Sequence, residues 1–283
     1  MSIDKIEKRL MMPKGQFNKT LEEPIEQLVS MLDASTNNLF SRPFFKTLSQ
    51  GGLTQEQWKV YGTQFYINCQ NFEKLLQTAF LNAQSSNLTS LAHELEVNLD
   101  DETGHAQNAL SHETMRLNFF TALGLTKEEL TSHNFSSILA GTKEHSAFID
   151  RLVKNNNVYQ QVGAFLVQEH LRNGLEYVKQ GVEKSFPDAF LIDEGDSPDI
   201  VTRKKNAGMY INMHLECDAE EHFPNLLEAI KPLMKNYKIK KEILAGVNSM
   251  FRAEIQFFKS LENAFSLEAK ANPAIAEQQK NQI

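Results

Sequence analysis

Acidic and histidine side chains recur at spacings that place them together on single helix faces. In the segment YINMHLECDAEEH (210–222), His214 and Asp218 are four residues apart and therefore share one face of a helix. His222 lies four residues further on and, at about 100° per residue, turns about 80° away from His214, whereas Glu221 stays nearer the line. A helix that presents an imidazole, a carboxylate and a third donor on one face provides half of a site for iron or manganese.

Two other segments carry a carboxylate where the periodicity calls for an apolar residue. Glu102 falls on an apolar stripe seven residues after Leu95, and Glu169 falls on another stripe four residues after Phe165. A buried carboxylate without a partner costs several kcal/mol, so each of these groups needs a cation or a metal ion.

Histidines lie close in sequence to the first of these carboxylates. His105 is three residues after Glu102 and His112 opens the next helical face, so spacing alone leaves both histidines open as partners. Three segments thus turn acids inward and two of them also supply imidazole, and one dinuclear carboxylate–histidine site would satisfy all of these groups. In the simpler interpretation the acids are salt-bridge partners, and His214 with Asp218 is an ordinary helix pair worth about 0.5 kcal/mol.

Composition and periodicity predict the elements that would position these groups. The chain has 283 residues, of which 41% are hydrophobic, with only 13 Gly and 8 Pro, and no stretch alternates apolar and polar residues. These features favour an all-α fold. A first helix begins near residue 21, and Thr54 with Gln57 forms a capping-box pattern that opens a long helix. Further helices are expected over 40–48, 88–102, 106–123, 127–130, 142–154, 158–186, 207–234 and 239–265, with a loop over 188–205.

No internal repeat and no linker divides the chain. We therefore expect a polar lead-in over 1–20, a single helical domain over 21–267, and a tail over 268–283 that is rich in Ala, Gln, Asn and Lys and is expected to be disordered.

Charge and cysteine content exclude several classes of partner. The formal net charge is −7 and no run holds more than three basic residues, which argues against a nucleic-acid groove. No apolar stretch approaches the roughly 20 residues that a membrane span needs, and the first residues do not resemble a signal peptide. Cys69 and Cys217 lie in different segments without metal-site spacing, so a reducing, cytoplasmic location is expected.

Around these residues the chain resembles the haem-oxygenase-like diiron oxidases, which include relatives of the chlamydial death-domain-associated protein and share their fold with thiaminase-type and pyrroloquinoline-quinone-synthase proteins. The resemblance spans roughly residues 32–265. NLDDETG (98–104) resembles the family's Asn-x-x-acid-Glu-x-Gly signature, HETMR (112–116) followed by ALG (122–124) resembles its His-x-x-Leu…Ala-Leu-Gly stretch, and 53–76 is similar to its second helix.

The match continues on the third segment, with one departure. His214 and Asp218 fit the family's His-x-x-x-Asp-x-x-His motif, but position 221 is Glu and the histidine comes one residue later, at 222. A local π-bulge would bring His222 into line; otherwise Glu221 is the alternative ligand.

The resemblance implies a haem-oxygenase-like bundle of roughly seven or more helices in a single domain. It also implies two iron ions per chain, with manganese as a candidate in one position. The implied ligands are Glu102, His112, Glu169, His214, Asp218 and His222, with His105 and Glu221 as alternates. Such a site would activate dioxygen to oxidise or cleave a small organic substrate (an amino acid, an amine or a fatty acid). Some members instead make p-aminobenzoate from one of their own tyrosines.

The tyrosine route makes three further residues candidates for catalysis. Lys179 lies ten residues after Glu169, Tyr210 lies four before the histidine of the third segment, and Tyr66 is a pocket candidate together with Tyr61. The plain alternatives are a solvated lysine and a core tyrosine.

Two other classes of function compete with an oxidase. A metal-free, thiaminase-like enzyme would use Cys69 or Cys217 as nucleophile and Glu169 as base. A non-catalytic helical interaction protein would use the acids structurally. A homodimer is a further hypothesis that no sequence feature tests.

Overall fold

The computed structural model describes residues 24–104, 110–131, 137–215 and 222–267. Helices account for most of these residues and no strand occurs among them, which confirms the predicted all-α class. The helices are α2 (Pro24–Phe40), α3 (Pro43–Ser49), α4 (Gln55–Ser85), α5 (Thr89–Thr103), α6 (His112–Ala122), α7 (Lys127–Thr131), α8 (Ala140–Asn155), α9 (Val158–Leu171), α10 (Leu175–Ser185), α11 (Pro187–Phe190), α12 (Pro198–Met213), α13 (Phe223–Ile230) and α14 (Tyr237–Ala264), with 3₁₀ turns over Arg172–Gly174 and Leu233–Lys235.

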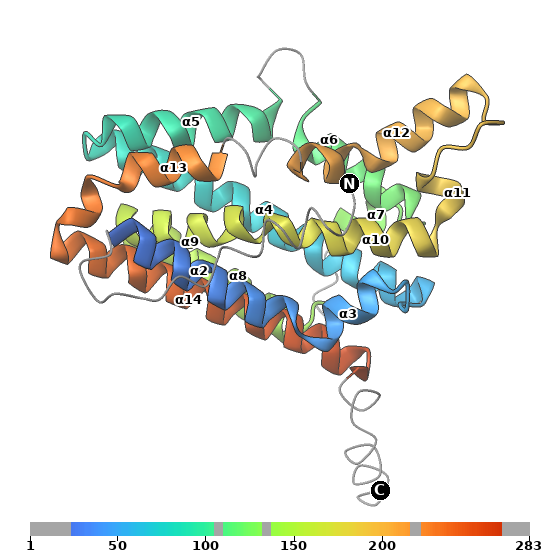
Figure 1. Ribbon diagram of the computed structural model, residues 1–283, viewed down its shortest axis with the longest axis horizontal. Helices are drawn as coiled ribbons and strands as arrows, with labels where there is room; N and C mark the ends of the chain where they lie inside the picture. Colours follow the sequence, from blue (N-terminus) through green and yellow to red (C-terminus); the bar gives the residue numbers. More distant parts are fainter. Residues whose placement is uncertain (1–23, 105–109, 132–136, 216–221, 268–283) are drawn as a thin grey trace, which may run out of the picture.

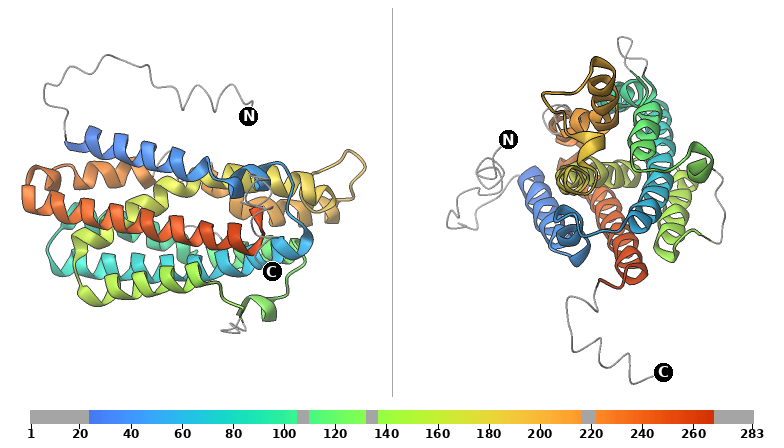
Figure 2. Two further views of the ribbon diagram at one scale, coloured as in Figure 1. Left: turned by 90° about the horizontal axis from the view of Figure 1, so that it is seen from below. Right: turned by 90° about the vertical axis from the view of Figure 1, so that its right-hand side faces the viewer.

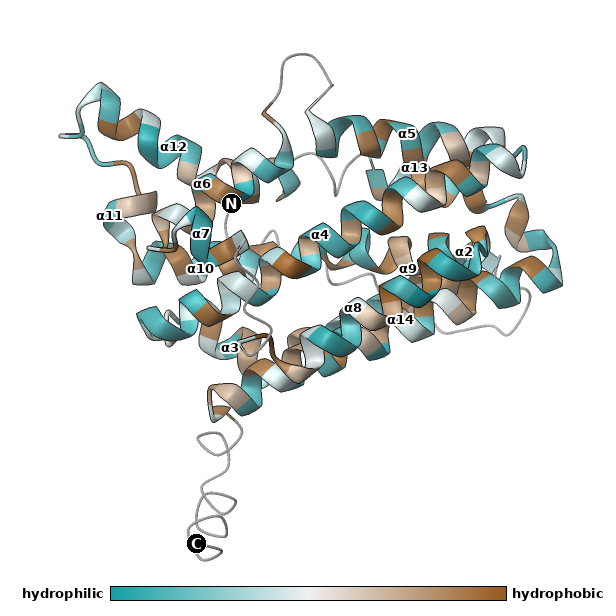
Figure 3. Cartoon of the chain, turned by 180° about the vertical axis from the view of Figure 1, so that it is seen from behind, coloured by the Kyte–Doolittle hydropathy of each residue, from teal (hydrophilic) through white to brown (hydrophobic). Residues whose placement is uncertain are grey.

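The long helices run along one axis and surround α9 (Figure 1). In the end view of Figure 2, α9 and α10 lie in the middle with the other helices around them. α9 packs against α14, α4, α13 and α2. Its sequence, VYQQVGAFLVQEHL, is apolar on most sides, which is typical of a helix enclosed by others. Hydrophilic and hydrophobic residues interleave along most of the remaining helices, as expected for elements with one face toward solvent (Figure 3).

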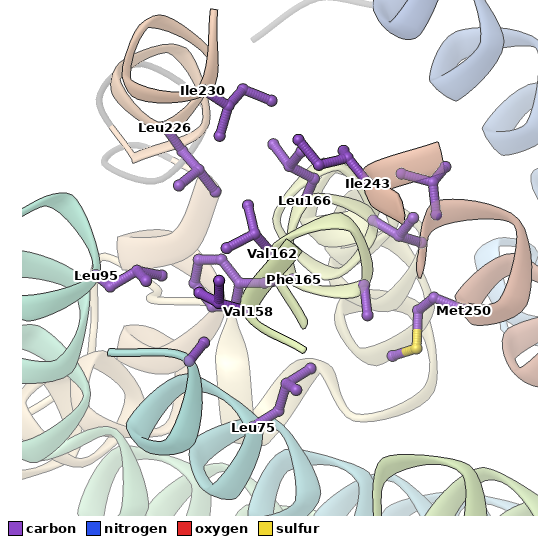
Figure 4. Close-up of a cluster of buried hydrophobic side chains, with 14 of the residues drawn as sticks. Leu75, Leu95, Val158, Val162, Phe165, Leu166, Leu226, Ile230, Ile243 and Met250 are labelled. Carbon is purple, nitrogen blue, oxygen red and sulfur yellow. The ribbon is translucent and has the colours of Figure 1, made fainter. Parts of the chain in front are cut away.

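Apolar side chains from six helices meet around α9. Leu166, Phe165 and Val162 of α9 are almost fully buried. Around them lie residues of α4, α5, α13 and α14, among them Leu75, Leu95, Leu226, Ile230, Ile243 and Met250 (Figure 4). A second cluster, rich in aromatic residues, fills the other end of the bundle and contains Phe44, Trp58, Phe119, Tyr210 and Phe257. Glu102 and Glu169 thus belong to helices whose inward faces are largely apolar.

The start of the longest helix is as predicted. Thr54 Oγ1 accepts a hydrogen bond from the Gln57 amide at 3.3 Å, and Gln57 Oε1 accepts one from the Thr54 amide at 2.9 Å. This reciprocal pair satisfies two amides that the first helical turn leaves without partners.

One helix that the sequence predicts as continuous is interrupted in the structure. The predicted helix over 158–186 is two helices, since a 3₁₀ turn over Arg172–Gly174 separates α9 from α10. Phe40 packs so closely on Gly174 that an added Cβ would lie 2.8 Å from its ring. The apolar period continues across this turn, so the break leaves no trace in the pattern.

The predicted loop over 188–205 is largely helical. Pro187 and Pro198 occupy the first turns of α11 and α12, and the side chain of Ser197 accepts from the amide of Ile200. Proline fits the first helical turn because its missing N–H would have no partner there. In the predicted helix over 207–234, the α-helical parts are α12, which ends at Met213, and α13, which begins at Phe223; residues 216–221 lie outside the described part of the chain.

Several predicted boundaries lie outside the described residues, namely the lead-in 1–20, the tail 268–283 and the start of the helix predicted over 106–123. No helix of the described ranges is long and apolar enough to cross a membrane.

Two glycines, one on each helix, allow α9 and α14 to pack closely. A Cβ on Gly163 of α9 would lie 2.1 Å from the Ile243 carbonyl oxygen, and a Cβ on Gly246 of α14 would lie 2.1 Å from the Gln160 carbonyl oxygen. We expect Gly163→Ala to lower the free energy of unfolding by about 2–3 kcal/mol, because the helices must separate. Gly208→Ala in α12 is the matched control. Its new methyl would meet only a side-chain atom of Asn212 at 3.4 Å, and it should gain up to about 1 kcal/mol. Equal effects of the two substitutions in urea unfolding would contradict the close crossing.

Candidate metal centre

Three buried side chains from three helices come together beside α4. Glu102 comes from α5, His112 from α6 and His214 from the end of α12. Each offers a ligand atom, and these atoms all lie within 4.8 Å of one another. Their exposed fractions are 4%, 3% and 0%. A carboxylate and two imidazoles at this separation can bind one divalent cation of the iron or manganese type.

Helix ends position all three residues. α5 ends at Gly104, whose φ of 76° places it in the left-handed region, so Glu102 stands in the last turn. Ser111 caps α6 by accepting from the Thr114 amide at 3.3 Å, which makes His112 the first helical residue. His214 follows the last residue of α12. Since α6 packs on both α5 and α12, the three ends meet.

The carboxylate of Glu102 is surrounded by cationic and polar groups. His112 Nδ1 lies 2.8 Å and Arg172 Nη2 3.1 Å from its Oε1, and Arg116 Nη1 lies 3.3 Å from its Oε2. Burial alone would raise the pKa of Glu102, but His112, Arg172 and Arg116 outweigh burial and hold this pKa well below its usual value. Glu102 is therefore an anion at neutral pH.

His214 is a neutral imidazole. Its pKa is well below the usual value, first because the ring is fully buried and then because Arg172, His112 and Arg116 disfavour another positive charge nearby. Metal ions bind imidazole in its neutral form, so this environment suits a ligand.

Two arginines, the buried Arg116 and the partly buried Arg172, balance the acids, and sequence reasoning missed both. Arg116 donates to Glu73, Glu102 and Glu113, and Arg172 donates to Glu102 and, at 3.5 Å, to Glu169. Their spacing in the sequence could have indicated them. Arg116 follows His112 by four residues and Arg172 follows Glu169 by three, and residues so spaced are neighbours on a helix. Glu169 is buried, and Arg172 connects it to Glu102.

The third predicted segment is only partly described. His214, Leu215 and His222, on either side of the undescribed residues 216–221, have π-helical hydrogen bonding, and the predicted π-bulge itself stays a prediction. His222 Nε2 lies 3.0 Å from Asp101 Oδ2, so His222 contacts the neighbour of Glu102 and lies outside the three-residue cluster. The predicted ligand Asp218 and the alternates His105 and Glu221 lie outside the described residues.

A largely aromatic cavity of about 90 Å³ adjoins the cluster, with Glu102, Arg116 and Arg172 among its walls. Tyr210 also lines it, and the Tyr210 ring centre is 4.4 Å from that of His214. Tyr61 lines the cavity as well, whereas Tyr66 and Lys179 do not. Tyr66 instead donates to Glu113 at 2.5 Å, and Lys179 is partly exposed on α10.

Solved structures with the same arrangement of helices define the fold. A CADD-like protein of unknown function from Nostoc punctiforme matches with a TM-score of 0.65 and 18% identity, over 85% of this chain and 98% of that one. A TenA homologue from Pseudomonas syringae pv. tomato also matches with a TM-score of 0.65, at 13% identity, over 89% of this chain and 99% of that one. The protein therefore has the haem-oxygenase-like all-α fold, as predicted.

Curated proteins give a partial match. The 4-aminobenzoate synthase of Chlamydia muridarum is 28% identical over 120 residues, which cover 42% of this chain and 48% of that protein. The 4-aminobenzoate synthase of Chlamydia trachomatis is 27% identical over 113 residues, which cover 39% and 46%. The chain thus spans about half the length of these relatives. No protein-family model matches the chain.

The charge balance at Glu102 leads to a stability prediction. Arg172→Met removes the cation between Glu102 and Glu169 while keeping the contact with Phe72, whose ring centre lies 4.7 Å from the guanidinium carbon. We expect the metal-free variant to lose about 3–5 kcal/mol of unfolding free energy, because the buried Glu102 and Glu169 each lose one cationic partner. Added Mn(II) should restore more stability to the variant than it gives the unsubstituted protein.

The matched control is Arg203→Met on the exposed face of α12, which should change stability by less than about 0.5 kcal/mol. Chemical unfolding with and without Mn(II) measures both variants. A loss at Arg172 no greater than at Arg203 would refute the assigned role.

Proposed function

We propose that the protein is a non-haem diiron oxidase or oxygenase that binds two iron ions per chain and oxidises a small organic molecule. The convergence of Glu102, His112 and His214 in a buried cluster carries this proposal. The remaining proposed ligands are Glu169, Asp218 and His222, and manganese is a candidate for one of the two positions. The bound metal would supply the binding and reduction of dioxygen.

The protonation states of the cluster fit a divalent cation. Glu102 is anionic and His214 is neutral, which are the forms in which carboxylate and imidazole bind metals. Neither ring nitrogen of His112 makes a hydrogen bond of good geometry within the described part of the chain, although Nδ1 lies 2.8 Å from Glu102. A buried imidazole of this kind is stabilised by coordination.

The surrounding residues would control what reaches the metal. Arg116 and Arg172 hold Glu102 in position and help to keep it ionised in the metal-free protein. The aromatic walls of the cavity would exclude bulk water and bind an apolar substrate body beside Tyr210. Tyr210 keeps its proton at neutral pH, since burial and then nearby Cys69 raise its pKa well above the usual value.

A thiol nucleophile of the thiaminase-like kind is less well supported. Burial raises the pKa of the Cys69 thiol, so little reactive thiolate is present at neutral pH. Cys217, the other candidate, lies outside the described residues.

Metal binding provides the direct test. Anaerobic titration of metal-free protein with Fe(II) should saturate at two ions per chain, and the visible absorption should change when oxygen is admitted. Glu102→Gln and His214→Ala should each weaken binding by about 100-fold or more, because loss of even an outer-shell partner costs about 10–100-fold. His93→Ala, at an exposed histidine, is the control and should bind as the unsubstituted protein does. Absence of iron uptake, or equal loss in the control, would exclude this function.

A second candidate reaction is the formation of 4-aminobenzoate from a tyrosine of the chain. The names of the chlamydial relatives and the 4.4 Å separation of the Tyr210 and His214 rings favour it, with Lys179 as the proposed catalytic lysine. Iron-loaded protein given oxygen and reductant should then release 4-aminobenzoate, and peptide mass spectrometry should find Tyr210 altered. Tyr210→Phe should form no product, whereas Tyr66→Phe, the control, should retain activity. Product formation by Tyr210→Phe would exclude Tyr210 as the source.

A further inference from the structure

Helix α14 contributes a buried carboxylate, Glu254, to the wall of the cavity. This carboxylate is not part of the metal cluster. Glu254 is 5% exposed and lines the cavity. His145 Nε2 lies 3.0 Å and Gln168 Nε2 lies 2.5 Å from its Oε1. A carboxylate only accepts, so His145 and Gln168 are both donors. Both donors reach Oε1, and no hydrogen bond within the described part of the chain goes to Oε2.

A second acceptor without a partner lines the same cavity. The amide oxygen of Asn68 on α4 is buried and makes no hydrogen bond to the described residues. Helix α8 connects this region to Glu254, since its His145 bonds Glu254 and the adjacent Ser146 accepts from Asn71 of α4. The cavity therefore presents two acceptors that no described residue donates to, the buried Asn68 Oδ1 and the Oε2 of Glu254. Acceptors of this kind are stabilised when a ligand donates to them.

Within the described part of the chain, the ion-pair partner of Glu254 is His145, and Glu254 pairs with no lysine or arginine there. The basic side chains that line the cavity are Arg116 and Arg172, and both already pair with acids at the metal cluster. Among the described lysines none lines the cavity, Lys179 included. Since no donor in the described part of the chain reaches Glu254 Oε2 or Asn68 Oδ1, a molecule that enters the cavity is a suitable donor to both.

We propose that Glu254 and Asn68 form the binding site for the protonated amine of a small aromatic substrate. Ammonium N–H groups make charge-assisted hydrogen bonds to a carboxylate, which are about twice as strong as neutral ones. The surrounding rings of Tyr61, Phe257 and Phe258 favour a cation and an aromatic body together. His145 and Gln168 are positioning residues that fix the Glu254 carboxylate. This assignment rests on the proposed function only in naming the substrate class of that site, because amine binding itself does not need the metal.

Binding of benzylamine to the full-length, metal-free protein tests the proposal. We expect calorimetric titration to detect benzylamine, with benzyl alcohol, its neutral counterpart, binding at least 10-fold more weakly. Glu254→Gln should weaken benzylamine by at least 10-fold and leave benzyl alcohol unchanged. Glu242→Gln is the control on the same helix, since Glu242 bonds Asn157 and Gln160 and does not line the cavity. This variant should bind both compounds as the unsubstituted protein does.

Asn68→Asp gives an opposite change at the same wall. A second carboxylate beside the amine should tighten benzylamine binding several-fold, and this variant keeps the test valid if Glu254→Gln does not fold.

Absence of benzylamine binding, equal affinity for the alcohol, or no change in either variant would overturn the proposal. Fe(II) titration of the same samples separates the two proposals: iron uptake without amine binding rejects only the amine site, and amine binding without iron uptake rejects only the oxidase.

Discussion

The neutralisation of one buried carboxylate, Glu102, is the interaction on which the rest of the site depends. An anion at 4% exposure persists only where positive or coordinating groups compensate for lost hydration. Here His112 and Arg116 of α6 and Arg172 of the 3₁₀ turn after α9 do so. Burial, and then Arg172, His112 and Arg116, lower the pKa of His214 and keep it neutral. The charge of Glu102 is thus balanced by α6 and by the turn after α9, and the neutral imidazole of His214 at the end of α12 lies beside it.

The cavity follows from the same arrangement. Arg172 belongs to the 3₁₀ turn that separates α9 from α10. This turn therefore places a guanidinium beside Glu102 and Glu169. Beyond it, α4 and α14 face each other across aromatic side chains, with Glu254 held by two donors. A polar cluster and a separate buried carboxylate thus line one small apolar volume.

The sequence was sufficient for the features that depend on local pattern. Helical periodicity predicted the all-α class, and the capping box at Thr54 predicted the start of α4. Glu102, His112 and His214, which were selected as candidate ligands, meet in space. Other features depend on tertiary contacts that have no period. The turn at Arg172–Gly174 is such a case, since Phe40 from a distant helix packs against Gly174. Arg116 and Arg172 were missed because an arginine on a helix is usually solvated, and burial here follows from the acids around it.

The reciprocal contact of Gly163 with the Ile243 carbonyl and of Gly246 with the Gln160 carbonyl has a consequence for sequence variation. Each glycine touches backbone, which cannot be replaced by a smaller side chain, so no compensating substitution on the partner helix can make room. The two positions are therefore restricted independently of each other. A homologue that carries a larger residue at either one must have a wider spacing between α9 and α14, and its cavity will have a different shape.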